Sequence, residues 1–438
     1  MCSTRGWVLA MGCAAGAFLL MSGAAVGQTH SADMNSDGQI GLGELLRVIQ
    51  FFNAGGYHCE SGTEDGFAPG TGGHDCTPHS SDFQDGPDWF VNLYEVLRLI
   101  QFFNLCGYQV DAASEDGFAP VPCLPPDPGE MLAVPGGAFA MGATDSGDDG
   151  TYSLADEHPA HGVDLSPYQI GRFEVTNRQY ADALNWANRS GYLRNGDGFA
   201  YGGGDVYASG VVVLDIESGN SQITFTEGRF APIIRDAHPM ATHPVVEVSW
   251  YGAICFCNWL SEIHGLQLCY DQTTWQRYEP VRNGFRLPTE AEWEHAAAWD
   301  TDRHWIYSFM SDTVDGTRCN DFGTNPLGFL AYPLTTPVGY YDGVHVDTQY
   351  SVSPIGAFDM SGNVWEWCQD WYDAGYYAAC EIQGVVADPI GPDAGSSRVL
   401  RGGSWGYAGN YCRSAQRAKG APDGTWWGHG FRMARSAG

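Results

Sequence analysis

One stretch decides the fold class of this chain: RVLRGGSW at residues 398–405, continued to Cys412 and followed by GFRMAR at 430–435. Further short motifs rich in glycine, tryptophan and charged residues precede it. They are VPGGAFAMG (134–142), EVTNRQY (174–180), PVVEVSW (244–250), FCNWL (256–260), RLPTEAEWE (286–294) and GNVWEW (362–367). Tryptophans beside glycines predict a core with little regular secondary structure, and they also suit a groove for an extended peptide.

Two segments allow predictions of local structure. In TEAE at 289–292, Thr289 can cap a helix and Glu292 can return the hydrogen bond, which is a capping box. The runs 211–215 and 222–226 are separated by residues that include glycine and serine, which predicts that they pair as a hairpin.

Three histidines are candidates for metal binding. His295 follows the predicted capping box, and we expect it to be a core or surface residue rather than a ligand. His158 and His161 have ligand-like spacing, but they follow an acidic loop, and we expect no metal there either.

Composition excludes two classes of partner. The 438 residues carry 21 Lys and Arg against 52 Asp and Glu, a net charge of −31. A phosphate backbone or an anionic membrane surface would be repelled, so we expect no nucleic-acid partner. Beyond the N-terminal run no stretch reaches ~18 apolar residues, so we expect no membrane span. Lys419 is the single lysine, a bias that we attribute to genomic composition.

The N-terminus predicts export. Residues 1–27 combine Arg5, an apolar run at 7–21 and small residues at 25–27, which is typical of a secretory signal peptide. The mature protein is therefore expected to be secreted, in an extracellular or periplasmic setting. Of the 13 cysteines, those at 2 and 13 would leave with the signal.

The remaining cysteines are expected to meet an oxidising compartment. The simplest pairing in the front part joins Cys59 to Cys76 and Cys106 to Cys123, although four cysteines allow three connectivities. An odd number follows in the rest of the chain. At least one of these is free, bound to metal or paired between molecules.

The segment 33–44 matches a twelve-residue calcium loop. Oxygen ligands fall at the required positions, and the glycine at position 6 allows the sharp turn. The expected ligands are Asp33, Asn35, Asp37, Gln39 through its carbonyl, and Glu44.

A second copy of this unit follows. Apolar residues at helical spacing predict a helix after the first loop, ended by Gly55-Gly56, and one helix cannot bury its apolar face alone. ELLRVIQFFN at 44–53 returns as EVLRLIQFFN at 95–104, and DGFAP at 65–69 returns at 116–120. The second loop is degraded. Whether it binds an ion through Asp82, Gln84, Asp88 and Glu95 stays open.

These features divide the chain into a signal peptide (1–27), duplicated calcium-loop repeats (28–119), a proline-rich linker (120–129) and a large domain (130–438). The repeats resemble dockerin-type modules, a small helical fold with calcium loops. This resemblance implies a scaffold protein of the cohesin type as partner.

The ordered motifs of the large domain are similar to those of the formylglycine-generating enzyme, or sulfatase-modifying factor, family, over about 130–436. The resemblance implies an α+β fold with much irregular structure, related to C-type-lectin-like folds and stabilised by calcium. It further implies that Asp359 and Glu366 are side-chain calcium ligands, with Gly362 and Val364 giving carbonyl oxygens.

The same resemblance implies a copper site. Oxidases of the family hold copper(I) with two cysteines five residues apart, of which the first lies three residues after the Gly-Gly-Ser serine. Here Ser404 and the substrate-contacting Trp365 are in place, and Cys412 stands at the second thiol position. Tyr407 stands at the first. A phenol with a pKa near ~10 is a hard ligand and cannot complete a two-thiolate copper(I) site.

We therefore predict a calcium-stabilised module that binds a peptide, glycan or protein ligand and lacks the copper oxidase activity. Its groove residues would be Trp365, Trp405 and Tyr407. Cys368 offers Cys412 a disulfide partner, which would leave no reactive thiol.

The alternative is an active oxidoreductase with an altered site. In that reading Ser404 and Cys412 act with Tyr407, or with a thiol brought from elsewhere, such as Cys257 or Cys269.

Overall fold

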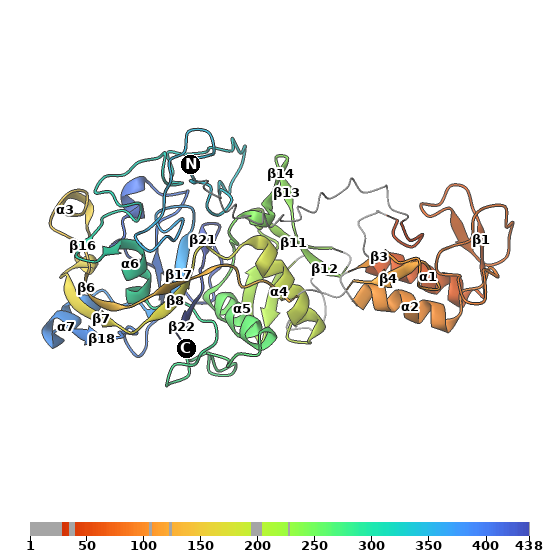
Figure 1. Cartoon of the computed structure of the whole chain (residues 1–438), viewed down its shortest axis with the longest axis horizontal. Coiled ribbons are helices and arrows are strands. Elements are labelled where there is room, and N and C mark those ends of the chain that lie inside the picture. The colour runs from red at the N-terminus through yellow and green to blue at the C-terminus, as the bar shows by residue number, and fades with distance from the viewer. Residues whose placement is uncertain are drawn as a thin grey trace, which may run out of the picture. The chain divides into compact units, whose positions relative to one another are not determined.

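The computed structural model describes residues 29–34, 40–104, 107–121, 125–193, 204–226 and 228–437. The chain divides into two compact units, Met1–Cys123 and Leu124–Gly438. Figure 1 follows both along the chain, from red at the N-terminus to blue at the C-terminus. Within the described ranges, no helix is long and apolar enough to cross a lipid bilayer.

In its described part the first unit has two helices and two short strand pairs. They are α1 (Leu42–Asn53), β1 (Tyr57–Cys59), β2 (Phe67–Pro69), α2 (Leu93–Asn104), β3 (Tyr108–Val110) and β4 (Phe118–Pro120). β1 pairs with β2 and β3 with β4, both antiparallel. The apolar faces of α1 and α2 bury Val48, Phe51, Leu99 and Phe102 in one core. The duplication therefore gives each helix the partner that it needs.

The two repeats of the first unit exchange hydrogen bonds reciprocally. The Tyr57 hydroxyl donates to Asp82 at 2.7 Å, and the Tyr108 hydroxyl donates to Asp33 at 2.6 Å. Each repeat also has its own ion pair: Arg47 with Asp65 and Arg98 with Asp116. Each tyrosine thus satisfies a buried carboxylate of the other repeat, so the two copies depend on one another.

One disulfide is present in the described part of the first unit. Cys59 and Cys76 are joined, with a Cα–Cα distance of 5.9 Å, which confirms that pairing. Cys106 and Cys123 lie outside the described residues, so their expected bond stays a prediction.

The second unit is α+β, with short elements and much irregular backbone. Its helices are α3 (Asp149–Tyr152), α4 (Asn177–Arg189), α5 (Trp250–Ile263), α6 (Glu290–Ala298) and α7 (Tyr376–Gln383), with 3-10 turns η1 (Ala155–Glu157), η2 (Met240–Thr242) and η3 (Gly409–Cys412). α4 and α5 lie side by side (Figure 1). Residues of both helices enter the largest core cluster.

In the described part of the second unit, three sheets contain more than two strands. The four-stranded sheet has the order β20 (Ala418–Gly420), β19 (Arg398–Arg401), β17 (Trp365–Trp371), β21 (His429–Gly430). One three-stranded sheet has the order β18 (Val386–Ala387), β7 (His161–Leu165), β6 (Gly137–Met141), and the other β22 (Ala434–Ser436), β8 (Tyr168–Gly171), β5 (Met131–Val134). The motifs around 365 and 401 are therefore neighbouring strands.

Four further strand pairs are β9 (Asp205–Ala208) with β10 (Val211–Asp215), β11 (Ile223–Thr226) with β12 (Arg229–Pro232), β13 (Ile234–Arg235) with β14 (His238–Pro239), and β15 (Trp299–Asp300) with β16 (Arg303–His304). The predicted pairing of 211–215 with 222–226 is wrong, because these runs belong to two different hairpins. Ser209 and Gly210 have φ of +49° and +83°, the positive values of a tight hairpin turn. This turn decides the partner of β10.

The capping box that begins α6 is confirmed. The Thr289 hydroxyl accepts from the Glu292 amide at 3.2 Å, and the Glu292 carboxylate accepts from the Thr289 amide at 2.8 Å. His295 on the same helix is buried against Phe139 and Tyr168. It is a core residue, as expected.

Buried arginine–carboxylate pairs join the motifs of the second unit. Within the described ranges they are Arg286 with Glu292, Arg401 with Glu290 and Glu294, Arg413 with Asp149 and Glu157, Arg417 with Glu290, and Arg432 with Glu366. A buried charge is stable only when it is paired and hydrogen-bonded. The planar guanidinium provides several donors in a fixed fork, which a lysine would not.

Arg401 provides a test of this arrangement, because its side chain is fully buried between Glu290 and Glu294 and also donates to two backbone carbonyls. We expect Arg401→Met to lower the free energy of unfolding by about 3–5 kcal/mol in urea titrations, because the carboxylates stay buried without their cation. The matched control, Arg303→Met, removes an exposed pair with Asp312 and should cost less than about 1 kcal/mol. Equal effects of the two substitutions would contradict the buried-pair argument.

His30 and His79 give the first unit a predictable pH dependence. Burial lowers the pKa of His30 to about 3 and that of His79 to about 4, so both are neutral in the folded unit. In the unfolded chain they titrate near ~6.5, so below that pH the unfolded state binds more protons and the free energy of unfolding falls. Each histidine should remove about 1.4 kcal/mol per pH unit until its folded pKa is reached.

Hydrogen exchange measured by mass spectrometry at pH 7 and pH 5 reports the opening free energy of α1 and α2 after correction for intrinsic rates. We expect a smaller value at pH 5, and a weaker pH dependence in His79→Gln. The exposed His345 belongs to the other unit, so His345→Gln should leave these peptides unchanged. The same opening free energy at both pH values would count against the buried neutral histidines.

Candidate functional site

The segment 398–412 leaves the four-stranded sheet at Arg401 and turns through Gly402 and Gly403 toward η3. Gly403 has φ of +78°, and a Cβ there would lie 2.7 Å from the Cys412 sulfur. Only glycine allows this approach. Ser404 is fully buried, whereas 39% of Tyr407 is exposed. Of the two positions that hold thiols in the family's oxidases, 407 is therefore open to solvent.

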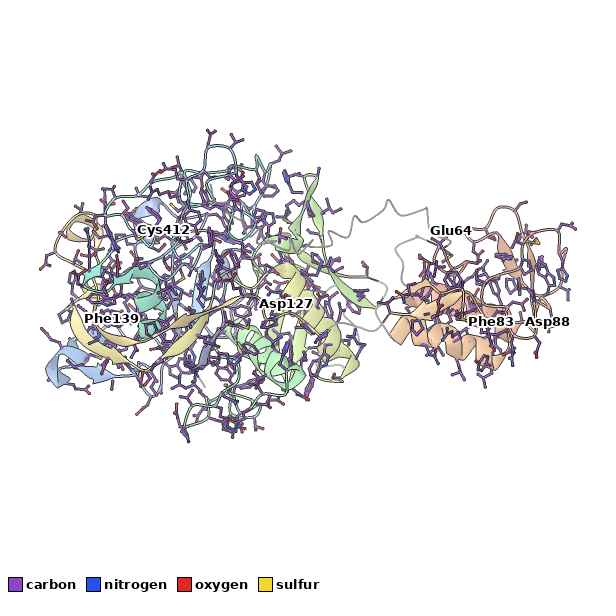
Figure 2. The ribbon with its side chains drawn as sticks, viewed as in Figure 1. Glu64, Phe83, Asp88, Asp127, Phe139 and Cys412 are labelled. Carbon is purple, nitrogen blue, oxygen red and sulfur yellow. A yellow bond between two sulfur atoms is a disulfide. The ribbon has the colours of Figure 1, made fainter. Side chains whose placement is uncertain are left out.

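Cys412 belongs to the second unit and is labelled in Figure 2. It has no exposed surface and packs with Ile306, Tyr307, Phe309 and Cys319. Burial raises the pKa of its thiol far above the ordinary range. The thiolate, which is the form that attacks substrates or binds metal, is therefore disfavoured.

The disulfide predicted between Cys368 and Cys412 is wrong. The structure does not join them, and Cys368 lies on β17 in a different core cluster from Cys412, with Trp293 and Tyr377. Cys257 and Cys269 belong to a third cluster. The thiol that does lie beside Cys412 is Cys319, which the spacing along the sequence did not indicate.

Aromatic rings gather where the segment 398–412 reaches the surface. We call Tyr332, Trp365, Trp405, Tyr407 and Trp427 the aromatic group. Ring centroids lie 5.6 Å apart for Trp365 and Tyr407, 4.5 Å for Trp405 and Trp427, and 4.9 Å for Tyr332 and Trp405. Trp365 and Trp405 are almost fully buried, whereas Tyr332 and Tyr407 are exposed. The structure thus brings the three predicted groove residues together and adds Tyr332 and Trp427.

The Trp405 indole carries an unsatisfied donor. Its Nε1 is buried and has no hydrogen-bond partner among the described residues. Buried indole N–H groups are normally paired, so this donor marks a place where a ligand or water could complete the site.

One of the residues predicted to hold calcium in the second unit, Glu366, is paired with the buried Arg432. Both oxygens of Glu366 accept from Arg432 at 2.6 Å, and one also accepts from Trp293 Nε1 at 2.8 Å. Asp359 accepts from the Gly339 amide at 2.6 Å. Gly362 and Val364, the predicted carbonyl ligands, lie in the turn that leads into β17.

A third carboxylate, which sequence analysis missed, joins this group. Glu174 is buried and accepts from Asn363 Nδ2 at 2.7 Å and from the Val364 amide at 3.2 Å. Burial, together with the charges of Asp359 and Glu366, raises the pKa of Glu174 well above its usual range. Burial also raises the pKa of Asp359, to about 6. Of the three carboxylates, Glu366 is hydrogen-bonded to Arg432, whose charge also acts on Glu174 and Asp359.

In the part of the chain that the structure describes, no three Asp, Glu, His or Cys side chains converge closely enough to hold a metal ion by themselves. The predicted calcium set of the second unit needs only two carboxylates, because its other ligands are carbonyls. His158 bonds to Ser153 and His161 packs on Tyr377, so these two histidines do not form a joint site.

The first calcium loop is described only at its ends. Asp33 and Glu44 are buried, and the Glu44 carboxylate accepts from the amides of Met34 and Gly41. The other expected ligands, Asn35, Asp37 and Gln39, lie outside the described residues.

The carboxylates of the second loop are held by donors of the protein itself. Asp82 accepts from the Tyr57 hydroxyl and from the amides of Asp88 and Trp89. Glu95 accepts from three amides, those of Phe83, Gln84 and Asn92.

Comparison with known proteins agrees with this architecture. Residues 121–437 match the family model described as "Sulfatase-modifying factor enzyme 1-like domain". The chain is 32% identical to the formylglycine-generating enzyme of Thermomonospora curvata over 325 residues, which cover 69% of this chain and 92% of the relative. It is 30% identical to that of Streptomyces coelicolor, covering 73% and 96%.

Among solved structures, PvdO of Pseudomonas aeruginosa matches with 22% identity and a TM-score of 0.47, covering 70% of this chain and 95% of PvdO. The family model alone spans well over half of the chain. Through residues 121–437, the chain belongs to the sulfatase-modifying factor family.

Proposed function

We propose that this protein is a secreted member of the family that binds a ligand at the aromatic group and does not perform copper-dependent oxidation. The observation that carries the proposal is the pair of positions 407 and 412: the exposed one is a tyrosine, and the cysteine is fully enclosed. A fold can keep its frame while its site changes, so membership of the family does not supply the activity.

The residues present do not fit copper(I). That ion prefers two soft thiolates, whereas Tyr407 offers a phenol oxygen and Cys412 is held as a neutral thiol by burial. Cys319 would bring a second sulfur, but 1% of it is exposed, so neither sulfur is open to a substrate. We therefore derive no oxidation step from this site.

The aromatic group supports binding instead. Tyr332 and Tyr407 are exposed, and their rings pack against the buried rings of Trp405 and Trp365. The buried tryptophans therefore hold the exposed rings in place. Rings of this kind bind apolar faces of a peptide or a glycan, and the hydroxyls of Tyr332 and Tyr407 provide directed hydrogen bonds. Because the exposed rings are held in place, the surface is preorganised. This lowers the entropy cost of binding.

We include calcium in the proposal as a structural ion at two places. In the second unit, burial and mutual repulsion raise the pKa of Glu174 and Asp359 beside the pair of Glu366 with Arg432, so a divalent cation there would stabilise the ionised carboxylates. Asp359 and the carbonyls of Gly362 and Val364 would hold it, with Glu366 shared with Arg432. In the first unit the ion would occupy the loop 33–44, where Asp33 and Glu44 stand at its two ends.

The partner proposed for the first unit is a scaffold protein. α1 exposes Leu42 and Leu46, and α2 exposes the equivalent Leu93 and Leu97. Apolar side chains exposed at matching positions of both repeats are typical of a protein-binding face. The disulfide between Cys59 and Cys76 agrees with the export that this partner requires.

The oxidase assay tests the proposed function. We incubate the purified full chain with copper(I) and a Cys-x-Pro-x-Arg peptide, in parallel with the formylglycine-generating enzyme of Thermomonospora curvata as positive control. Because Tyr407 replaces a thiol and Cys412 is enclosed, mass spectrometry should find formylglycine only in the control reaction. Formylglycine formed by this protein would overturn the proposal in favour of an active oxidase with an altered site.

Calcium removal tests the structural ion. We expect chelator to lower the Tm of the calcium-loaded protein, because an ion bound only to the folded state stabilises it. Asp33→Ala should remove the part of the shift that belongs to the first unit, and Asp359→Asn the part that belongs to the second. Asp312→Asn, at an exposed position, is the matched control. An unchanged Tm in chelator would count against both sites.

A further inference from the structure

The segment 314–322 lies directly along the segment 407–412. The Phe322 amide donates to the Tyr407 carbonyl at 2.9 Å. A Cβ on Gly409 would lie 2.3 Å from Val314 Cγ2 and 2.7 Å from Asp321 Oδ2, so any larger residue there would displace these side chains. The two segments therefore touch at several points along their length.

Cys319 and Cys412 lie within these contacts. Their exposed fractions are 1% and 0%, and both belong to one small core cluster with Ile306, Tyr307 and Phe309. A negative charge on the Cys412 sulfur would raise the pKa of the Cys319 thiol, so the two sulfurs are also electrostatic neighbours. Two cysteines from distant parts of the sequence thus share one enclosed space.

Both cysteines are free thiols in the structure, and we propose that Cys319 and Cys412 are joined by a disulfide in the exported protein. The bond forms by thiol–disulfide exchange with a low-molecular-weight disulfide such as oxidised glutathione, or with a disulfide-donating protein. One cysteine thiolate attacks the donor and releases a thiol, and the second cysteine then displaces the other donor sulfur. The two cysteines lose two electrons and two protons, and the donor disulfide becomes two thiols.

The chemistry of the cluster favours a disulfide over a metal site. Ile306, Tyr307 and Phe309 supply apolar contacts, whereas Asp315 and Asp321 nearby would repel thiolates. A copper(I) ion on two thiolates would leave a net negative charge in this enclosure, which is costly to bury. A disulfide is neutral and needs no hydrogen bonds, so it suits the space. Both sulfurs are enclosed after folding, so the bond forms while the chain folds.

Such a bond has a consequence for the ligand surface. Tyr407 lies between the Gly-Gly-Ser turn and Cys412, and its carbonyl is already held by Phe322. A covalent link at Cys412 fixes the end of this segment to the loop that carries Phe322. The exposed Tyr407 ring would then be presented by a segment that is anchored at both ends.

Disulfide mapping tests the inference on the full chain, refolded in a glutathione redox buffer. Free thiols are alkylated in denaturant without reductant, and trypsin with a protease that cuts before aspartate then separates Cys319 from Cys368. We expect Cys319 and Cys412 in one linked peptide, with the bond between Cys59 and Cys76 as internal control and Cys368 alkylated. Alkylation of both Cys319 and Cys412 while the control bond is intact would overturn the proposal. Pairing of either with another cysteine would overturn it as well.

Stability of variants gives a second readout. Cys319→Ser, Cys412→Ser and the double variant should each lower the Tm of the oxidised protein by the same amount, roughly 5–15 °C, because each removes the same bond. Additive losses would indicate two independent thiols and contradict the proposal. These measurements do not involve a ligand or formylglycine, so their failure is distinguishable from failure of the proposed function.

Discussion

Buried arginine–carboxylate pairs are the interaction on which the rest of the second unit depends. Arg413 reaches back from the C-terminal part to Asp149 and Glu157, both of its partners being fully enclosed. Arg401 spans Glu290 and Glu294 on α6 in the same way. Taking these groups out of water is costly, and the cost is offset only when each guanidinium finds its carboxylates in the correct geometry. The pairs therefore determine which sequence motifs pack together in a unit with little regular secondary structure.

The buried arginine–carboxylate pairs also determine which side chains reach the surface. Successive side chains of a strand point to opposite faces, so the pairing of Glu366 with Arg432 and Trp293 directs its neighbour Trp365 the other way, toward Tyr407. On the adjacent strand, Arg401 holds the end of β19 from which the Gly-Gly-Ser turn departs. The buried ion pairs do not contact the aromatic group, yet they fix the backbone that carries it. A site supported in this way can exchange its exposed residues without loss of the fold.

Sequence alone predicted those features whose cause is local. The capping box at Thr289 and the bridge between Cys59 and Cys76 depend on residues close in the chain, and both are confirmed. The pairing of 211–215 with 222–226 failed because the tight turn at Ser209 and Gly210 was overlooked. Glu174 and Cys319 could not be found, because their roles come from neighbours far away in sequence. The near absence of lysine was attributed to genomic composition, yet the buried guanidinium forks show positions where lysine would not serve.

In this chain, the residues that identify the family are not the residues on which its oxidation chemistry would depend. The buried pairs of Arg401 and Arg432 lie in the motifs that identify the family, and they require every partner to be kept. Position 407 is less constrained, because 39% of Tyr407 is exposed and its ring packs against the rings of Trp365, Tyr411 and Trp427. A phenol in place of a thiol at this position disturbs no buried ion pair. It does not provide the soft ligand that copper(I) needs. Family membership is therefore recorded in the buried charges, whereas the proposed absence of copper oxidation rests on one exposed ring.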